Sequence, residues 1–221
     1  MNLLYKYCVK LLLVLFCIVF YGVQGLHAQK QNPNIIAKLD ELGLRENTLI
    51  LFTGDNGTDE PIVSLLNGKE IPGGKGTTTD NGTHVPLISN WNGKIKQGQV
   101  CDDLIDFSDF LPTLCDVADI KLSKDKTIDG VSFMPKLYGK KGTPREWIYC
   151  WYSRNGSPEK ARILARNHRY ILYATGEFYE ISKNPMENNP LDLNSLAKKT
   201  RDIHEQLNDV LKKYQNELNT K

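Results

Sequence analysis

The chain has 221 residues, a moderate share of charged residues and a nearly balanced charge. Its formal net charge is +2, and acidic and basic residues are interspersed along the sequence. This pattern excludes the clustered basic surface of nucleic-acid-binding proteins, so we predict no nucleic-acid partner. The length beyond the first 28 residues is sufficient for a domain with a hydrophobic core.

The N-terminal segment has the layout of a secretory signal peptide. Lys6 and Lys10 precede an uninterrupted apolar run over residues 11–21, and small residues as far as Ala28 offer cleavage positions. A membrane anchor is the alternative, but the run is too short, because a helix needs roughly 20 residues to span a bilayer. We therefore expect a signal peptide over residues 1–28, no stable membrane anchor, and a secreted or periplasmic protein.

The cysteines do not form a disulfide framework. Cys8 and Cys17 fall within the predicted signal peptide, which leaves Cys101, Cys115 and Cys150. Three cysteines without the paired spacing of metal ligands can form at most one disulfide bond. The fold must therefore be stabilised mainly by its hydrophobic core.

The first part of the remaining chain is predicted to alternate between helices and buried strands. Apolar residues at helical spacing indicate a short helix over 33–42 that ends at Gly43. An apolar run over 47–53 predicts a strand buried on both faces, as in a parallel sheet. Residues 57–83 have no apolar period and predict a long loop. Next we expect strands over 85–91 and 103–106 and a helix capped by Ser108 or Asp109.

The last part of the chain is rich in short predicted strands. Three β-rich runs separated by turn residues, over 161–166, 169–174 and 177–181, are typical of an antiparallel meander. Apolar residues then recur at helical spacing through the last 25 residues or so, which predicts a terminal helix that packs on this sheet.

Asp55 and Asn56 are the first candidate functional residues, because they follow a buried strand directly. Ligands of open α/β sheets collect at the carboxyl ends of strands. A carboxylate and an amide carbonyl are hard oxygen donors, which suit Ca²⁺ or Mg²⁺ better than zinc. An ordinary Asp-Asn-Gly turn is the alternative interpretation.

Lys75 is the second candidate, since glycines flank it in the sequence Gly73-Gly-Lys-Gly76. Glycines let the backbone pass close to an anion, which the lysine ammonium can then meet as a point charge. The spacing is not that of a nucleotide-binding P-loop. An exposed basic loop without a ligand is the alternative.

Together these motifs resemble the sulfatase family, within the alkaline-phosphatase-like superfamily. The similar segments follow the family's order along nearly the whole chain beyond residue 28, and each alone is less specific than the ordered set. They are Glu46–Gly57, Gly74–Thr78, Asn81–Ile88, Asn92–Gly98, Asp109–Ala118 and Phe178–Asn189.

The resemblance assigns roles to individual residues. Asp55 and Asn56 would be two ligands of the active-site Ca²⁺, and Lys75 would hold a sulfate oxygen and offset charge that develops toward the leaving group. His84 occupies a substrate-binding position where the family often has Arg, and Asp80 stands near it where the family often has Glu. A packed or solvent-facing histidine without a ligand is the alternative for His84.

The resemblance also implies the architecture. We expect an α/β fold in which an incomplete alkaline-phosphatase-like parallel-sheet domain over 29–145 carries the candidate site. A small antiparallel sheet with a terminal helix would follow it, over 146–221. The expected substrate is a sulfated small molecule or glycan.

The family's nucleophile is a formylglycine made from Cys or Ser in a Cys/Ser-x-Pro-x-Arg motif. The only near match, Cys150-Trp-Tyr-Ser-Arg154, lacks the proline and follows the Asp-Asn motif instead of preceding it. Two ligands are also too few for Ca²⁺, which takes roughly 6–8 oxygens. We therefore predict a sulfuric ester hydrolase by family whose chain is inactive alone, with the N-terminal half either interrupted in the gene or supplied by a separate chain. Two alternatives stay open: a phosphoesterase of the same superfamily, and a non-catalytic secreted protein that binds sulfated glycans.

Overall fold

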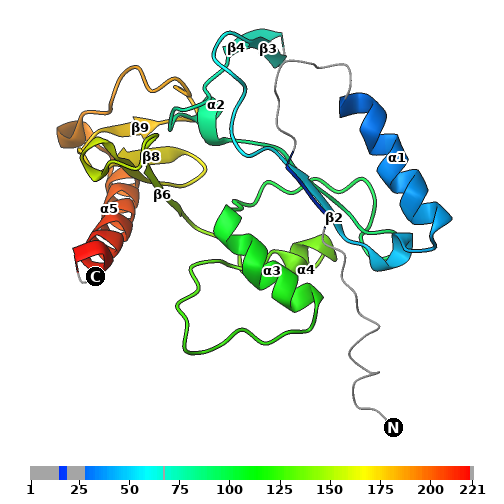
Figure 1. The fold of residues 1–221 in the computed structure, drawn as a ribbon. Coiled ribbons are helices and arrows are strands. Elements are labelled where there is room, and N and C mark those ends of the chain that lie inside the picture. The colour runs from blue at the N-terminus through cyan, green and yellow to red at the C-terminus, as the bar shows by residue number, and fades with distance from the viewer. Residues whose placement is uncertain (1–14, 19–27, 67, 220–221) are drawn as a thin grey trace. The chain divides into compact units, whose positions relative to one another are not determined.

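The computed structural model describes residues 15–18, 28–66 and 68–219, and it divides the chain into two compact units (Figure 1). The first unit runs through Asp55 and resumes over residues 85–144. The second unit contains residues 56–84 and the chain from Arg145 onward. The segment 56–84 thus groups with the C-terminal sheet, whereas the sequence placed it in the domain over 29–145. The bounds drawn from the sequence stay predictions.

The first unit is built on a three-stranded sheet with the order β1-β2-β5. β1 (Leu15–Ile18) pairs parallel with β2 (Ile50–Thr53), and β5 (Leu87–Asn90) pairs antiparallel with β2. The predicted strands near residues 50 and 88 are confirmed, although the second runs antiparallel. β1 falls within the predicted signal peptide, most of which, 1–14 and 19–27, lies outside the described residues. The signal peptide therefore stays a prediction.

Helix α1 (Ala28–Glu41) lies between β1 and β2 in the chain and starts earlier than the sequence indicates. It ends as predicted, because Gly43 has a φ of +65°, a left-handed conformation that glycine adopts without strain. The 3₁₀ turn η2 (Arg45–Asn47) follows, so β2 begins at Ile50 and not at residue 47 as predicted. No helix within 28–66 or 68–219 is long and apolar enough to cross a membrane.

The region around Asp106 corrects one prediction and refines another. The expected strand over 103–106 is absent, and Leu104 forms only an isolated bridge. Asp109 is the N-cap residue of the helix that begins at Phe110, as predicted, but its side chain makes no cap hydrogen bond to that helix. The side-chain cap belongs to the preceding 3₁₀ turn over 107–109, where the Asp106 carboxylate accepts the Ser108 N–H at 2.9 Å and Asp109 Oδ2 accepts the Asp106 N–H at 2.8 Å. Such local side-chain bonds occupy backbone groups that strand pairing would use.

The capped segment forms the helical layer of the first unit. The 3₁₀ turn η3 (Phe107–Asp109) leads into α3 (Phe110–Val117), and the short α4 (Met134–Leu137) follows after a long connection. The buried core of this unit consists of apolar side chains from β2 and its N-terminal flank, from α3 and from the residue before α4: Leu49, Leu51, Phe110 and Phe133.

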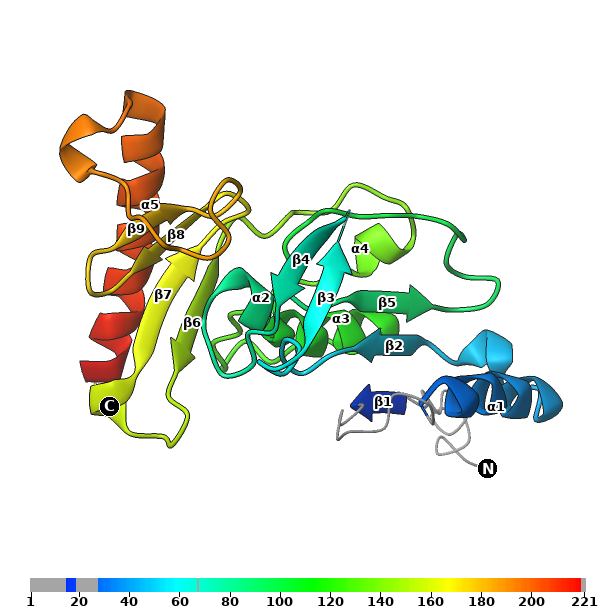
Figure 2. The same ribbon diagram turned by 90° about the horizontal axis from the view of Figure 1, so that it is seen from above.

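The second unit contains the antiparallel meander predicted over 161–181, which is confirmed as β7-β8-β9, and a further strand, β6, pairs with β7 to give the order β6-β7-β8-β9. Its strands are β6 (Ile148–Tyr152), β7 (Arg162–Arg166), β8 (Tyr170–Tyr173) and β9 (Phe178–Glu180), with 3₁₀ turns η4 (Pro158–Lys160) and η5 (Leu193–Ser195). The terminal helix α5 (Lys198–Asn219) packs on this sheet (Figure 2). Its Leu207 is fully buried against Ala165, Leu172 and Phe178.

The predicted long loop over 57–83 contains regular structure. β3 (Val63–Leu66) and β4 (Lys69–Pro72) form an antiparallel hairpin, and α2 (Asp80–Thr83) is a single helical turn. The prediction of a long loop was therefore wrong for the residues of β3, β4 and α2. The hairpin was not predicted because both of its strands are almost entirely exposed. Strands with no buried face need no alternation of apolar and polar residues, which is the signal that reveals strands in sequences.

Candidate functional site

Asp55 and Asn56 lie where the sequence places them, just beyond the carboxyl end of β2. Asp55 is exposed and ends the first unit, while Asn56 is half-buried and begins the second. The next residue is held in place, since Gly57 N–H donates to Gly82 O at 2.8 Å. A Cβ at Gly57 would collide with the backbone of Asn81, so this close approach requires glycine.

Lys75 belongs to a loop that the structure brings against the segment following Asn56. The backbone N–H groups of Gly74 and Lys75 both donate to the carbonyl oxygen of Thr58, at 2.9 and 3.0 Å. Gly74 is buried and Lys75 is exposed. Backbone hydrogen bonds therefore fix the lysine segment to Thr58, two positions after Asn56 in the same unit.

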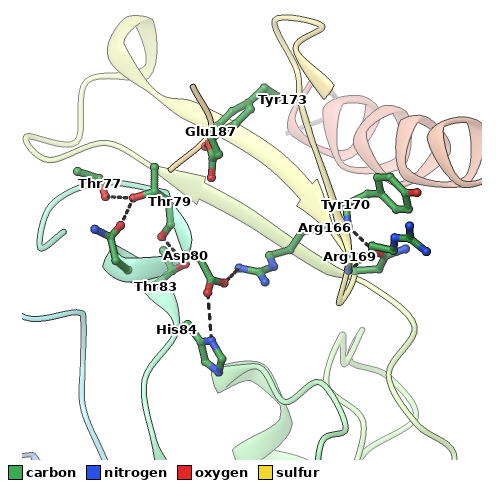
Figure 3. A network of polar contacts seen from close by, with 12 residues as sticks. Thr77, Thr79, Asp80, Thr83, His84, Arg166, Arg169, Tyr170, Tyr173 and Glu187 are labelled. Carbon is green, nitrogen blue, oxygen red and sulfur yellow. Dashed lines mark hydrogen bonds and ion pairs between the residues drawn. The ribbon is translucent and has the colours of Figure 1, made fainter. Parts of the chain in front are cut away.

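Side-chain hydrogen bonds of residues that follow Lys75 in the sequence close the loop (Figure 3). Thr77 Oγ1 donates to Gly74 O at 2.7 Å and lies 2.6 Å from Thr79 Oγ1. Thr79 in turn donates to Asn81 Oδ1 at 2.5 Å, and Asn81 Nδ2 donates to Pro72 O at 2.9 Å. Residues 72–81, which we name the Lys75 loop, thus form a self-bonded ring of backbone and side chains.

Glycine is required where this loop meets α2. A Cβ at Gly82 would lie 2.5 Å from Thr77 Oγ1 and 2.7 Å from Thr77 O, and closer still to Gly74 O. Distances below 3.0 Å do not occur between a real Cβ and such atoms. The glycine content that made this region look irregular in the sequence is what lets its backbone segments pack together.

Asp80 links the Lys75 loop to the C-terminal sheet. Arg166 Nη1 lies 2.9 Å from Asp80 Oδ1, and His84 Nδ1 lies 3.3 Å from Asp80 Oδ2 (Figure 3). The hydrogen bond with His84 and the positive charge of Arg166 lower the pKa of Asp80 to about 2, despite the opposing effect of burial. The same hydrogen bond raises the pKa of His84. The His84 side chain is 74% exposed, in keeping with a solvent-facing histidine, and its role in substrate binding stays a prediction.

A second polar contact joins the loop to the neighbouring strand β8. The hydroxyl of Tyr173 lies 3.0 Å from Thr78 Oγ1 and donates to Glu187 Oε2 at 2.6 Å. Burial is the main cause of the raised pKa of both Tyr173 and Glu187. Arg166 and Tyr173 were not among the candidate residues predicted from the sequence. The one feature that could have indicated them is a polar group at the last position of an otherwise largely apolar strand.

Asp55 and Asn56 are the candidate oxygen ligands for a metal ion. Within the described residues no three His, Cys, Asp or Glu side chains gather as a metal cluster. The carboxylate of Asp55 and the amide of Asn56 are adjacent hard donors at the end of β2, which fits one side of a calcium shell. The calcium ion, its ligands and the role of Lys75 therefore stay predictions.

Comparison with known proteins identifies the family. The sulfatase family model matches residues 33–120. The chain is 36% identical over 150 residues to the uncharacterized sulfatase YdeN of Escherichia coli, covering 65% of this chain and 26% of that protein. It is 31% identical over 211 residues to human steryl-sulfatase, covering 77% of this chain and 36% of that enzyme. The chain belongs to the sulfatase family. Its partial coverage of these relatives fits a C-terminal portion of a sulfatase.

Solved sulfatase structures share the fold. The chain superposes on BT4656, solved in complex with its substrate D-glucosamine-2-N,6-O-disulfate, with a TM-score of 0.68 at 22% identity, covering 86% of this chain and 39% of that one. The 2-O glycosaminoglycan sulfatase BT1596 gives a TM-score of 0.65 at 23% identity, covering 88% and 42%. The alkaline-phosphatase-like α/β fold expected from the sequence is thereby confirmed.

Proposed function

We propose that this sulfatase-family chain carries the calcium-binding and sulfate-binding part of a hydrolase of sulfate esters. The observation that carries the proposal is the pair of hydrogen bonds from Gly74 and Lys75 to Thr58 O, which fixes the lysine loop beside the segment that begins at Asn56. A metal cation bound at Asn56 and the Lys75 ammonium would both attract the negative oxygens of a sulfate group.

Each residue has a distinct task in this proposal. Asp55 and Asn56 would hold Ca²⁺, and a bound calcium ion supplies positive charge that stabilises developing negative charge on sulfate oxygens. Lys75 is exposed on a loop whose backbone is fully tied down, so its ammonium can bind a sulfate oxygen as a mobile point charge. His84 would add a further positive charge when its ring is protonated, and its hydrogen bond with Asp80 raises its pKa.

We further propose that the chain alone does not turn over substrate, since it has no Cys/Ser-x-Pro-x-Arg segment. Cys150, in the nearest match to that motif, lies inside β6 and pairs with Leu164 of β7. A nucleophile must instead reach the substrate from a position where it can be activated. An N-terminal portion of a sulfatase is the partner this proposal implies, and a sulfated small molecule or glycan is the substrate.

The proposal is tested by titrating the purified chain with inorganic sulfate, with and without calcium chloride, and following binding by calorimetry. We expect Lys75→Ala to weaken sulfate binding by roughly tenfold, as for the loss of a hydrogen bond to a charged group. Calcium should tighten sulfate binding only weakly, because the chain supplies two of the roughly 6–8 oxygens that Ca²⁺ takes, and Asp55→Ala should remove that effect. Lys69→Ala is the matched control, since Lys69 is an exposed lysine on β4 of the same segment. Equal affinities for wild type and Lys75→Ala would refute the role of Lys75.

Activity gives a second test. The chain is expected to release no 4-nitrophenol from 4-nitrophenyl sulfate in the presence of Ca²⁺. Turnover that Lys75→Ala abolishes would overturn the proposed inactivity while supporting the role of the lysine.

One observation favours a second candidate function, hydrolysis of phosphonate or phosphate esters. The chain has a TM-score of 0.60 with a phosphonate monoester hydrolase from Silicibacter pomeroyi, at 22% identity. Inorganic phosphate and sulfate compared in the same titration separate the two, because tighter Lys75-dependent binding of phosphate would favour the phosphoesterase. Heparin binding that persists in Lys75→Ala would instead favour a non-catalytic glycan-binding protein.

Secretion is proposed from the N-terminal sequence alone. Expression of the full chain in a bacterial host should yield a periplasmic or secreted product. N-terminal sequencing of that product should begin close to residue 29, whereas a cytoplasmic product that retains Met1 would contradict the signal peptide.

A further inference from the structure

We propose that Arg166 and Tyr173 are positioning residues that hold the Lys75 loop in its binding conformation from the C-terminal sheet. The proposal rests on the proposed role of Lys75 in sulfate binding, and it adds two residues from β7 and β8 to that function. Neither residue needs to touch the ligand. Each acts through a side chain of the loop, and Figure 3 shows the first of these contacts, between Arg166 and Asp80.

The first tether is the ion pair between Arg166 and Asp80. Arg166 ends β7 and is 13% exposed, and its Nη1 lies 2.9 Å from Asp80 Oδ1. Asp80 begins α2 and is 28% exposed. A partly buried ion pair is screened less by water and salt than a surface pair, so it can fix the position of α2 against the sheet. His84 takes the other carboxylate oxygen, which leaves Asp80 Oδ1 for the arginine.

The second tether is a hydrogen bond from the most buried residue of the loop. Thr78 is 1% exposed, and its Oγ1 lies 3.0 Å from the hydroxyl of Tyr173, itself 4% exposed. The single proton of Tyr173 is donated to Glu187, so the Thr78 hydroxyl donates to Tyr173. Loss of the phenol oxygen would leave the buried threonine hydroxyl without this acceptor, which destabilises the position of Thr78.

These two tethers hold residues that lie a few positions after Lys75 in the sequence. Thr78 and Asp80 come three and five positions after the lysine, and their partners lie on adjacent antiparallel strands. On its other side the loop is held through Thr58 O. Glycine has the greatest backbone freedom of any residue, and three glycines surround Lys75. The hydrogen bonds within the loop join it only to itself, so the contacts with β7 and β8 are what fix it to the C-terminal sheet.

The experiment measures amide hydrogen exchange and sulfate affinity in the full chain. In Arg166→Gln and Tyr173→Phe, we expect the Gly74 and Lys75 amides to exchange at least about tenfold faster, while β8 amides keep the wild-type rate, because the opening is local. Sulfate affinity should fall about threefold to tenfold, and Arg166→Lys should restore most of it, since a lysine can still pair with Asp80. Arg169→Gln, which removes the exposed pair with Glu180, is the matched control and should change neither readout.

A double-mutant cycle separates positioning from direct binding. In a Lys75→Ala background, Arg166→Gln should cause no further loss of sulfate affinity, because the residue acts only through the lysine. A further loss would mean that Arg166 binds sulfate itself, and the proposal would be wrong. Acceleration of exchange throughout β7–β9, or unchanged exchange of the loop, would also overturn it. If wild type binds no sulfate, the proposed function fails, but the exchange measurement still decides whether these residues hold the loop.

Discussion

Replacing Asp80 by Asn tests the charge network that joins the Lys75 loop to the C-terminal sheet. Asparagine keeps the size of the side chain but removes the negative charge that Arg166 and His84 share. The pKa of Asp80 falls from 3.8 to about 2 in the folded protein, and one pKa unit is equivalent to about 1.4 kcal/mol. The carboxylate therefore contributes about 2 kcal/mol to the free energy of unfolding at neutral pH.

The pH dependence follows from the direction of that shift. Because the pKa is lower in the folded state, the contribution is fully present above the unfolded pKa of 3.8 and is lost as pH falls toward about 2. The raised pKa of His84 acts in the opposite sense, since its contribution is present below pH 6.5 and is lost as pH rises through the folded pKa. That second effect is small, because the ring is mostly exposed to solvent.

Urea unfolding of wild type and Asp80→Asn at several pH values measures these contributions. We expect the variant to lose about 2 kcal/mol at pH 6 and about 1 kcal/mol at pH 3, where the carboxyl of the unfolded chain is mostly protonated. Arg169→Gln serves as the control for removal of a surface ion pair and should lose less than about 1 kcal/mol. A difference between wild type and Asp80→Asn that is the same at pH 3 and pH 6 would refute the charge network.

Three further substitutions test the packing that supports the site. Gly82→Ala would force its methyl group into Gly74 O and Thr77, so we expect a loss of about 1–3 kcal/mol in urea unfolding, together with weaker sulfate binding; wild-type stability would contradict the close approach. Leu207→Ala empties a fully buried position between α5 and the sheet and should cost about 2–5 kcal/mol, which a thermal melt can detect. Asp106→Ala removes a helix cap and should cost about 1 kcal/mol. Ser108→Ala should cost less, and the reverse order would contradict the assignment of the cap.

Local patterns in the sequence predicted most of the elements. The strands β7–β9 were predicted from short β-rich runs between turn residues, and β8 is buried at every position. The terminal helix was predicted because it buries one face, so its apolar residues recur at helical spacing. The β3–β4 hairpin was not predicted because its strands are almost entirely exposed and show no alternation of apolar and polar residues. Asp109 is the N-cap residue of α3 as predicted, but the side-chain capping box forms one turn earlier, between Asp106 and Asp109 at η3.

What the sequence determined by itself is the family, the α/β class and the identity of Asp55, Asn56 and Lys75 as candidates. These inferences depend on residue types in order along the chain, which a single sequence contains. The tertiary structure alone decided that Lys75 is anchored at Thr58 and that Arg166 and Tyr173 hold its loop. Such contacts join residues up to 95 positions apart, and their geometry arises only when the strands pair and the glycines let backbones approach.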